Sequence, residues 1–223
     1  MQRSSQVRFT THTDQAVSGI WSDVELLGKW RDGNTDAGNE LLRRHLSTIY
    51  QFFRKKVNDG IDDLVQQTML GCVQGCESFR LEASFRTYLF AIARNVLHRY
   101  FDRRTRELAR IDHGAMNVTD PGESPSDVVA ARMEQRRLGV ALRRLPISDQ
   151  IILELYYWES MTGSELAAVL GLPEPAIRSR LRRALVRLRT VVAGLPPTGH
   201  EIQSIDADLD EWARSLRQLR ETN

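Results

Sequence analysis

Apolar residues recur at every third or fourth position along most of this chain, which is the spacing of an amphipathic helix. No stretch shows the sustained alternation of apolar and polar residues that a strand requires. The first pattern predicts a helix from Thr13 to about Trp30, and the second predicts one over about 37–57. In the second helix, the positions expected to face inward are Leu41, Leu42, Leu46, Ile49, Tyr50 and Phe53. The pattern favours an all-α fold.

Two further helices are expected before residue 111. Asp62 and Asp63 open the first of them, where their carboxylates complement the positive end of the helix dipole, and the pattern continues to about Gly75. A long helix then extends over about 83–109. Its apolar stripe consists of Phe85, Leu89, Ile92, Ala93, Val96, Tyr100 and Phe101.

The composition changes after residue 110. The segment that follows is rich in Gly, Asn, Asp, Ser and Pro, which is typical of a flexible linker. Helical spacing then resumes and predicts four helices, at 127–145, 148–158, 163–170 and 174–192.

Pro196 and Pro197 interrupt the pattern before a last amphipathic helix in an acidic segment. The expected organisation is two small helical domains that are joined by a linker and flanked by extensions. The parts are an N-terminal extension (1–35), a first domain (36–110), a linker (111–126), a second domain (127–193) and a C-terminal extension (194–223).

Residues 163–189 carry the most specific local motif. A short helix is followed by Gly171, which tolerates a left-handed backbone, and by a helix with Pro175 in its first turn. This arrangement is typical of a helix-turn-helix, whose second helix fits the major groove of DNA. A hairpin with a solvated basic face is the alternative, but like charges at i and i+4 repel. The second helix presents Arg178, Arg180, Arg182, Arg183, Arg187 and Arg189, against Glu174 as its only acid.

The long helix over 83–109 carries a second basic pattern. Its arginines are interleaved with aromatic residues, a combination that holds unstacked single-stranded bases. The alternative is that most of these aromatic side chains belong to the core, because several fall on the apolar stripe. The arginines are Arg86, Arg94, Arg99, Arg103, Arg104, Arg106 and Arg110, and the aromatic residues are Phe85, Tyr88, Phe90, Tyr100 and Phe101, with Phe79 just before.

The composition and the absence of certain motifs argue against some classes of protein but do not by themselves indicate a function. The formal net charge is only +2, and three of the 31 basic residues are lysines. The five histidines are scattered and no nucleophile, phosphate-loop or metal-ligand motif is present, so we expect no enzyme, no cofactor and no metal. Cys72 and Cys76 are expected to be core residues of a reduced protein. No signal peptide or membrane span is evident, which favours a cytoplasmic protein that does not bind membranes.

Three motifs together carry a family resemblance. The segments 62–68 (DDLVQQT) and 83–95 (ASFRTYLFAIARN) look like region two of the extracytoplasmic-function (ECF) sigma factors, in the sigma-70 family. The segment 141–146 (ALRRLP) and the helix-turn-helix up to Arg189 are similar to region four of the same family. The resemblance covers residues 37–192 and implies a subunit that binds core RNA polymerase and directs promoter recognition and transcription initiation, in response to a stress or environmental signal.

The resemblance also implies residue roles. The surface that docks on the β′ clamp helices of RNA polymerase would consist of Asp62, Asp63, Leu64, Val65, Gln66 and Thr68. The residues implied in reading the minus-ten element of promoter DNA are Phe79, Arg94, Asn95, His98, Arg99 and Arg103. Those implied in reading the minus-thirty-five element are Arg178, Ser179, Arg180, Arg182 and Arg183. An anti-sigma factor or another regulator is a further expected partner.

Some positions depart from the family pattern. Gln67 stands where many members have Glu, Arg99 where many have Asp, and Gly163 where an aromatic residue is common.

The alternative function is a free-standing, dimeric helix-turn-helix regulator of transcription. It would explain residues 174–189 but would leave the basic long helix and the Asp62 segment without a role.

Overall fold

The computed structural model describes residues 21–79, 83–110 and 137–195. These residues form helices joined by short turns, with no strand among them, which confirms the all-α class. The chain divides into two units, 1–44 and 45–223, each of which has its own packing. The expected helical segments over 13–20 and 127–136 and the C-terminal helix beyond 195 lie outside the described residues.

The first unit contains α1 (Asp23–Arg31) and the start of α2 (Thr35–Arg54). Ser22 caps α1: its hydroxyl accepts from the Glu25 amide at 3.3 Å, and the Glu25 carboxylate accepts from the Ser22 amide at 2.7 Å. Trp21 and Ser22 are therefore not helical, and the helix predicted from Thr13 through Trp30 is wrong at these two positions. Arg44 of α2 donates to the Trp21 carbonyl, just before α1, at 2.6 Å, and also to Glu40 of its own helix at 3.0 Å.

Replacing two glycines of these helices with alanine is expected to have opposite effects on the free energy of unfolding. A Cβ on Gly38 would lie 2.7 Å from the Trp30 ring, whereas a Cβ on Gly28 would meet nothing within 4 Å. Gly38→Ala is expected to lower the free energy of unfolding by about 1–3 kcal/mol, because the ring must move. Gly28→Ala is expected to raise it by about 0.5–1 kcal/mol, because alanine favours a helix interior. Denaturant unfolding of both variants checks this, and equal effects would contradict the packing of Trp30.

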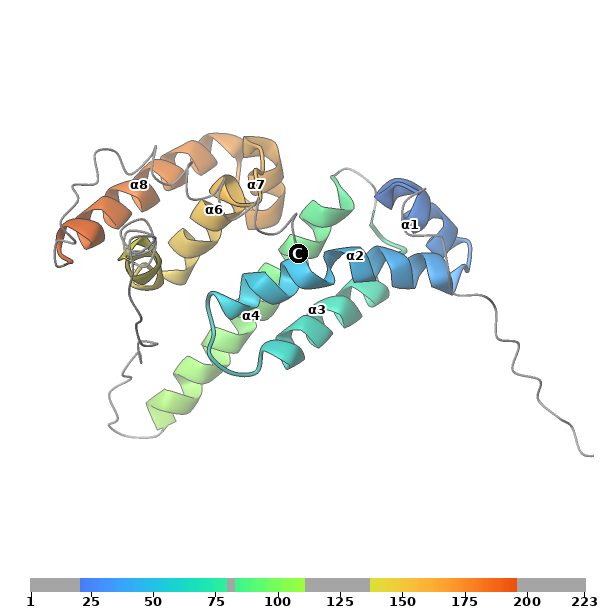
Figure 1. Ribbon diagram of the computed structural model, residues 1–223, viewed down its shortest axis with the longest axis horizontal. Helices are drawn as coiled ribbons and strands as arrows, with labels where there is room; N and C mark the ends of the chain where they lie inside the picture. The colour runs from blue at the N-terminus through green and yellow to red at the C-terminus, as the bar shows by residue number, and fades with distance from the viewer. Residues whose placement is uncertain (1–20, 80–82, 111–136, 196–223) are drawn as a thin grey trace, which may run out of the picture. The chain divides into compact units, whose positions relative to one another are not determined.

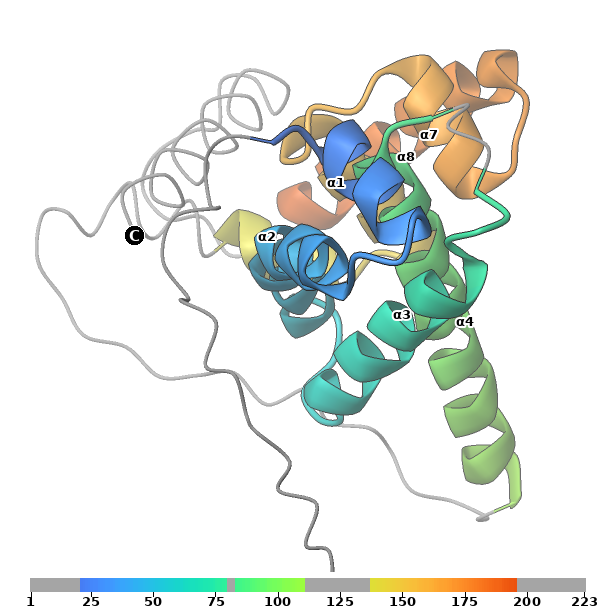
Figure 2. The same ribbon diagram turned by 90° about the vertical axis from the view of Figure 1, so that its right-hand side faces the viewer.

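The first half of the second unit contains the end of α2, α3 (Ile61–Gly75) and α4 (Phe85–Arg110). Figure 1 and Figure 2 show α3 lying along α4. The centre of this packing is aromatic, with Phe52 in edge contact with Phe53 and with Phe90 at ring-centre distances of 5.4 and 5.5 Å. All three rings are almost completely buried. Burial of large aromatic side chains is a main source of stability for so small a core.

Two residues of α2 that were expected to face inward are exposed. Leu46 is 45% exposed and Tyr50 is 38% exposed, whereas Phe52 is buried. At about 100° of rotation per residue, Leu46 and Tyr50 lie about 60° and 100° round the helix from Ile49, on the side away from Phe52. The buried stripe is therefore centred on Ile49, Phe52 and Phe53, and the expectation for Leu46 and Tyr50 is wrong.

The second half of this unit contains a helical segment (137–143), α6 (Ile147–Tyr157), α7 (Gly163–Leu170) and α8 (Glu174–Ala193). Thr162 and Glu165 form a capping box that begins α7, and Gly171 ends it with φ of 62°. The helices predicted over 148–158, 163–170 and 174–192 are confirmed to within one residue at each end. Their shared core consists of Ile151, Ile152, Leu155, Leu166, Ile177, Ala184 and Leu188.

Candidate nucleic-acid and polymerase interfaces

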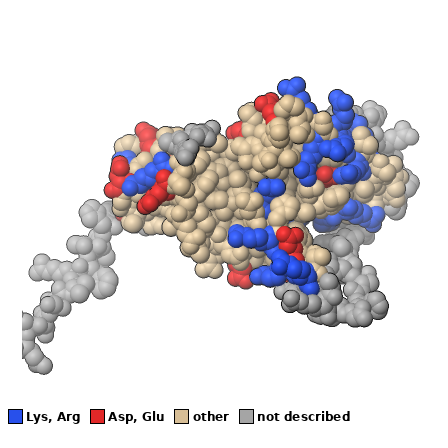
Figure 3. Space-filling model, turned by 180° about the vertical axis from the view of Figure 1, so that it is seen from behind, with Lys and Arg blue, Asp and Glu red and all other residues tan. Residues whose placement is uncertain are grey.

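The helix-turn-helix directs its arginines outward because its apolar residues are spaced for one face. Ile177, Ala184 and Leu188 are buried, and the residues between them are left on the opposite side of α8. Figure 3 shows Lys and Arg side chains gathered over α8. Four of the five residues predicted for this surface are exposed, namely Arg178, Ser179, Arg182 and Arg183, and Arg180 is half-buried.

Arg187 of α8 has a partner on another helix. Arg187 forms an ion pair with Asp149 of α6 at 2.6 Å, and the Asp149 side chain is only 4% exposed. A buried carboxylate without a partner is costly, so this contact stabilises the packing of α8 on α6. Arg187 therefore has a structural partner, although its side chain is still 54% exposed.

The C-terminal half of α4 is the second basic surface, and Figure 3 shows it as a further gathering of Lys and Arg. Asn95, Arg99 and Arg103 follow one another at intervals of four and are all exposed. Arg94 and His98 are half-buried beside them. Burial lowers the pKa of His98 below its ordinary value, and the cation of Arg94 adds to this effect. His98 is thus held neutral near pH 7, where one ring nitrogen donates and the other accepts.

Asp59 organises this end of α4, although the sequence analysis did not single it out. The Tyr100 hydroxyl donates to Asp59 at 2.6 Å, and Arg104 donates to the same carboxylate at 2.9 Å. The hydrogen bond from Tyr100 is the main reason that the pKa of Asp59 is lowered. These bonds tie the turn before α3 to α4 beside Arg103, so Tyr100 and Arg104 are partly engaged within the protein.

The aromatic residues near α4 divide between the core and the surface. Phe85 and Phe90 are buried, as the alternative interpretation of the pattern held. Phe79 stacks on Tyr88 at a ring-centre distance of 4.4 Å, and both are half-buried. Phe79 is thus the residue of the predicted minus-ten set that lies in a partly exposed aromatic stack.

The outer face of α3 differs from the expected docking surface. Asp62, Asp63 and Gln66 are exposed, but Leu64, Val65 and Thr68 are buried. The Thr68 hydroxyl donates to the Leu64 carbonyl at 2.8 Å, inside the helix packing. The side chains of Leu64, Val65 and Thr68 therefore face the core and cannot form an outer surface, because their side of α3 packs against its neighbours.

Two residues that the sequence did not single out complete this face. Leu70 is 53% exposed and Val73 is 47% exposed, and their spacing from Gln66 places them on its side of α3. Exposed apolar side chains beside carboxylates are typical of a protein interface. The signal available in the sequence was the repeat of Asp63, Gln66, Leu70 and Val73 at intervals of three and four. We name these residues, with Asp62, the α3 outer face.

Other chemistry is not apparent in the part of the chain that the structure describes. Its His, Cys, Asp and Glu side chains form no cluster suited to a metal ion. Cys72 and Cys76 are buried and form no disulfide, and burial, with a smaller effect of the neighbouring Cys76, raises the pKa of Cys72 to about 12. None of the helices in these ranges has the length and apolar character of a membrane span.

A helix-turn-helix with exposed arginines and a separate basic helix defines a helical DNA-binding protein, and comparisons specify which kind. Residues 41–107 match the model of sigma-70 region 2, and residues 135–188 match that of sigma-70 region 4. The ECF RNA polymerase sigma factor RpoE of Cereibacter sphaeroides is 31% identical over 181 residues, covering 79% of this chain and 97% of that protein. NccH, an RNA polymerase sigma factor of Alcaligenes xylosoxydans, is 29% identical over 178 residues, covering 76% and 94%.

A solved structure agrees with these matches. CnrH in complex with the cytosolic domain of CnrY is 26% identical to this chain, with a TM-score of 0.55, covering 78% of this chain and 99% of CnrH. The chain belongs to the sigma-70 family and is an ECF RNA polymerase sigma factor. The family resemblance that the sequence suggested is therefore confirmed.

Proposed function

We propose that this sigma factor uses three separate surfaces to bring core RNA polymerase to a promoter. The single observation that supports this best is the helix-turn-helix of α7 and α8, with Arg178, Arg182 and Arg183 exposed on its second helix. Exposed arginines suit both guanine edges and phosphates in the major groove. We assign them, with Ser179 and Arg180, to the minus-thirty-five element.

The basic half of α4 is proposed to read and open the minus-ten element. Asn95, Arg99 and Arg103 offer an exposed row of donors, and neutral His98 lies beside them. Arg94 is half-buried next to this row, and Phe79 contributes the partly exposed aromatic ring that unstacked bases need. This assignment keeps the residues predicted from the sequence and leaves Phe85 and Phe90 to the core.

The α3 outer face is proposed to dock on the β′ clamp helices of core polymerase. Its carboxylates provide charge complementarity, and Leu70 and Val73 provide the apolar area that stable docking requires. Leu64, Val65 and Thr68 support the helix from inside rather than contacting the polymerase.

Asp63→Arg is expected to weaken binding to core polymerase by about tenfold or more, because it reverses a charge at the N-terminal end of this surface. Pull-down of purified core polymerase with the full chain measures the effect. Asp36→Arg is the matched control, since Asp36 is also exposed but lies in the first turn of α2. Equal retention of polymerase by both variants would contradict the assignment of α3.

The remaining expectations follow from the family. We propose that the protein works in the cytoplasm, as a subunit without catalysis of its own, in two domains (36–110 and 127–193) joined by a linker. CnrH, its structural relative, is found with the cytosolic domain of CnrY, so we propose that a protein partner also regulates this chain. A free-standing dimeric regulator would bind duplex DNA specifically without polymerase, which the same pull-down distinguishes.

A further inference from the structure

Glu174 is the only acidic residue of α8, and it belongs to none of the three proposed surfaces. It lies in the first turn of the helix, directly after Pro173, and its side chain is 49% exposed. One turn later, Arg178 begins the series of exposed arginines. The first residues of the second helix are the ones that contact base edges when a helix-turn-helix lies in the major groove. Glu174 therefore places a carboxylate at the end of α8 that meets the bases.

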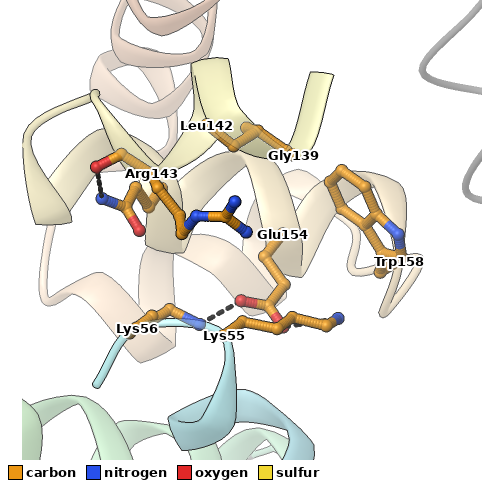
Figure 4. A pocket seen from close by; sticks show the side chains of 8 residues that line it. Lys55, Lys56, Gly139, Leu142, Arg143, Glu154 and Trp158 are labelled. Carbon is orange, nitrogen blue, oxygen red and sulfur yellow. Dashed lines mark hydrogen bonds and ion pairs between the residues drawn. The ribbon is translucent and has the colours of Figure 1, made fainter. Parts of the chain in front are cut away.

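Two buried acids of α6 show what usually stabilises a carboxylate in this half of the chain. Asp149 is 4% exposed and is paired with an arginine at 2.6 Å. Glu154 is 8% exposed, and Figure 4 shows Lys55 and Lys56 reaching its carboxylate. Such partners compensate the cost of burying a negative charge. Glu174 differs from both acids because half of its side chain is exposed, so packing does not explain why an acid stands there.

Two neighbours define the place of the Glu174 carboxylate. The Nη2 of Arg178 lies 3.8 Å from it, which is longer than a hydrogen bond, so the arginine attracts the carboxylate without using its acceptor oxygens. Gly163, the first residue of α7, leaves the necessary space. A Cβ at position 163 would lie 3.1 Å from Oε1 and 3.4 Å from Cγ of Glu174, so a larger side chain would displace the carboxylate.

Non-specific attraction to DNA does not explain this acid either. The exposed Arg178, Arg182 and Arg183 attract the phosphates of any DNA sequence. A carboxylate on the same helix is repelled by those phosphates and weakens the attraction. A negative charge in the first turn does stabilise the helix dipole, but it would do so equally well in a helix that never meets DNA. An acid at the point of base contact is explained if it recognises a base.

We propose that Glu174 is a specificity-determining residue, whose carboxylate accepts a hydrogen bond from the N4 amino group of a cytosine in the minus-thirty-five element. A carboxylate accepts hydrogen bonds and does not donate them. In the major groove, guanine and thymine present acceptors, and adenine places its acceptor N7 beside its amino group, whereas cytosine presents the amino group alone. Cytosine therefore suits Glu174 best. The proposal deepens the proposed function and rests on its placement of α8 in the major groove.

The test compares the base preferences of variants of the full chain on duplex DNA. Each protein is bound, at one salt concentration, to a duplex library that is randomised over the element, and the retained duplexes are sequenced. The unmodified chain is expected to select cytosine at one position of the element. Glu174→Ala is expected to reduce that preference by about tenfold and to leave the preferences at the other positions unchanged.

Two further variants separate base recognition from charge. Glutamine suits the N6 and N7 edge of adenine, so Glu174→Gln is expected to change the preferred base at this position from cytosine to adenine. Asp36→Ala is the matched control, because it removes an exposed carboxylate from the first turn of α2, outside the helix-turn-helix. It should leave every base preference unchanged.

The outcomes distinguish this proposal from the proposed function. Specific selection by the unmodified chain that survives unchanged in both Glu174 variants, with uniformly tighter binding to all duplexes, would overturn the role of Glu174 alone. Its carboxylate would then act only through charge. If the unmodified chain selects no sequence at all, the proposed role of α8 fails, and the role of Glu174 fails with it.

Discussion

Replacing Arg182 and Arg183 together with alanine is expected to abolish most recognition of the upstream promoter element. Both side chains are exposed on α8, on the face opposite the buried Ile177 and Leu188. A base contact by arginine contributes about 1–3 kcal/mol, so the loss of two implies at least about 30-fold weaker binding. Gel-shift titration with duplex DNA that carries the element, at a fixed salt concentration, measures this ratio.

The control for this pair removes an arginine elsewhere. Arg144→Ala removes one positive charge at an exposed position that follows the helical segment 137–143. It is expected to leave sequence-specific binding unchanged, and the double variant should keep its thermal midpoint because neither side chain is buried. Equal loss of binding to specific and unrelated DNA would mean that the two arginines contact only phosphates.

Phe90→Ala is expected to lower the free energy of unfolding by about 3–5 kcal/mol. Phe90 is 1% exposed and packs edge-on against Phe52, so its removal leaves a cavity at the centre of the α2–α4 packing. Denaturant unfolding followed by circular dichroism measures the loss.

Phe101→Ala, on the same helix, is the comparison variant that is expected to have a small effect on stability. Phe101 is half-buried and contacts the Tyr100 ring at 5.3 Å, so its truncation is expected to cost much less stability. If Phe90→Ala were as stable as the unmodified protein, the aromatic core described for this unit would be wrong. Together the two variants distinguish core from surface among the aromatic residues of α4.

The helix-turn-helix could be predicted almost to the residue because its determinants are local. Gly171 supplies the left-handed turn, Pro175 suits the first turn of α8, and the spacing of Ile177, Ala184 and Leu188 defines the inner face. The beginning of α1 was predicted wrongly because the apolar pattern continues through Trp21 and Ser22. The Ser22–Glu25 capping box nevertheless starts the helix after Ser22. Leu46 and Tyr50 show a similar limit, since periodicity gives the spacing of a stripe better than its centre.

The candidate surfaces were predicted less completely, because side-chain environment depends on distant residues. Asp59 and Tyr100 are 41 positions apart, and Lys56 and Glu154 are 98 positions apart. No helical period connects such pairs. The family motif on α3 likewise did not distinguish outward Gln66 from inward Val65, and it omitted Leu70 and Val73, whose exposure is evident only in the packed structure.

Run-off transcription tests the central claim most directly. Core RNA polymerase is combined with the purified full chain on promoter fragments from its own genome, with omission of the chain as the control. A sigma factor is expected to produce transcripts with a defined start only when the chain is present, and Asp63→Arg should reduce them. Specific binding of the chain to duplex DNA without association with polymerase, and without any new transcript, would contradict the account and favour a free-standing regulator.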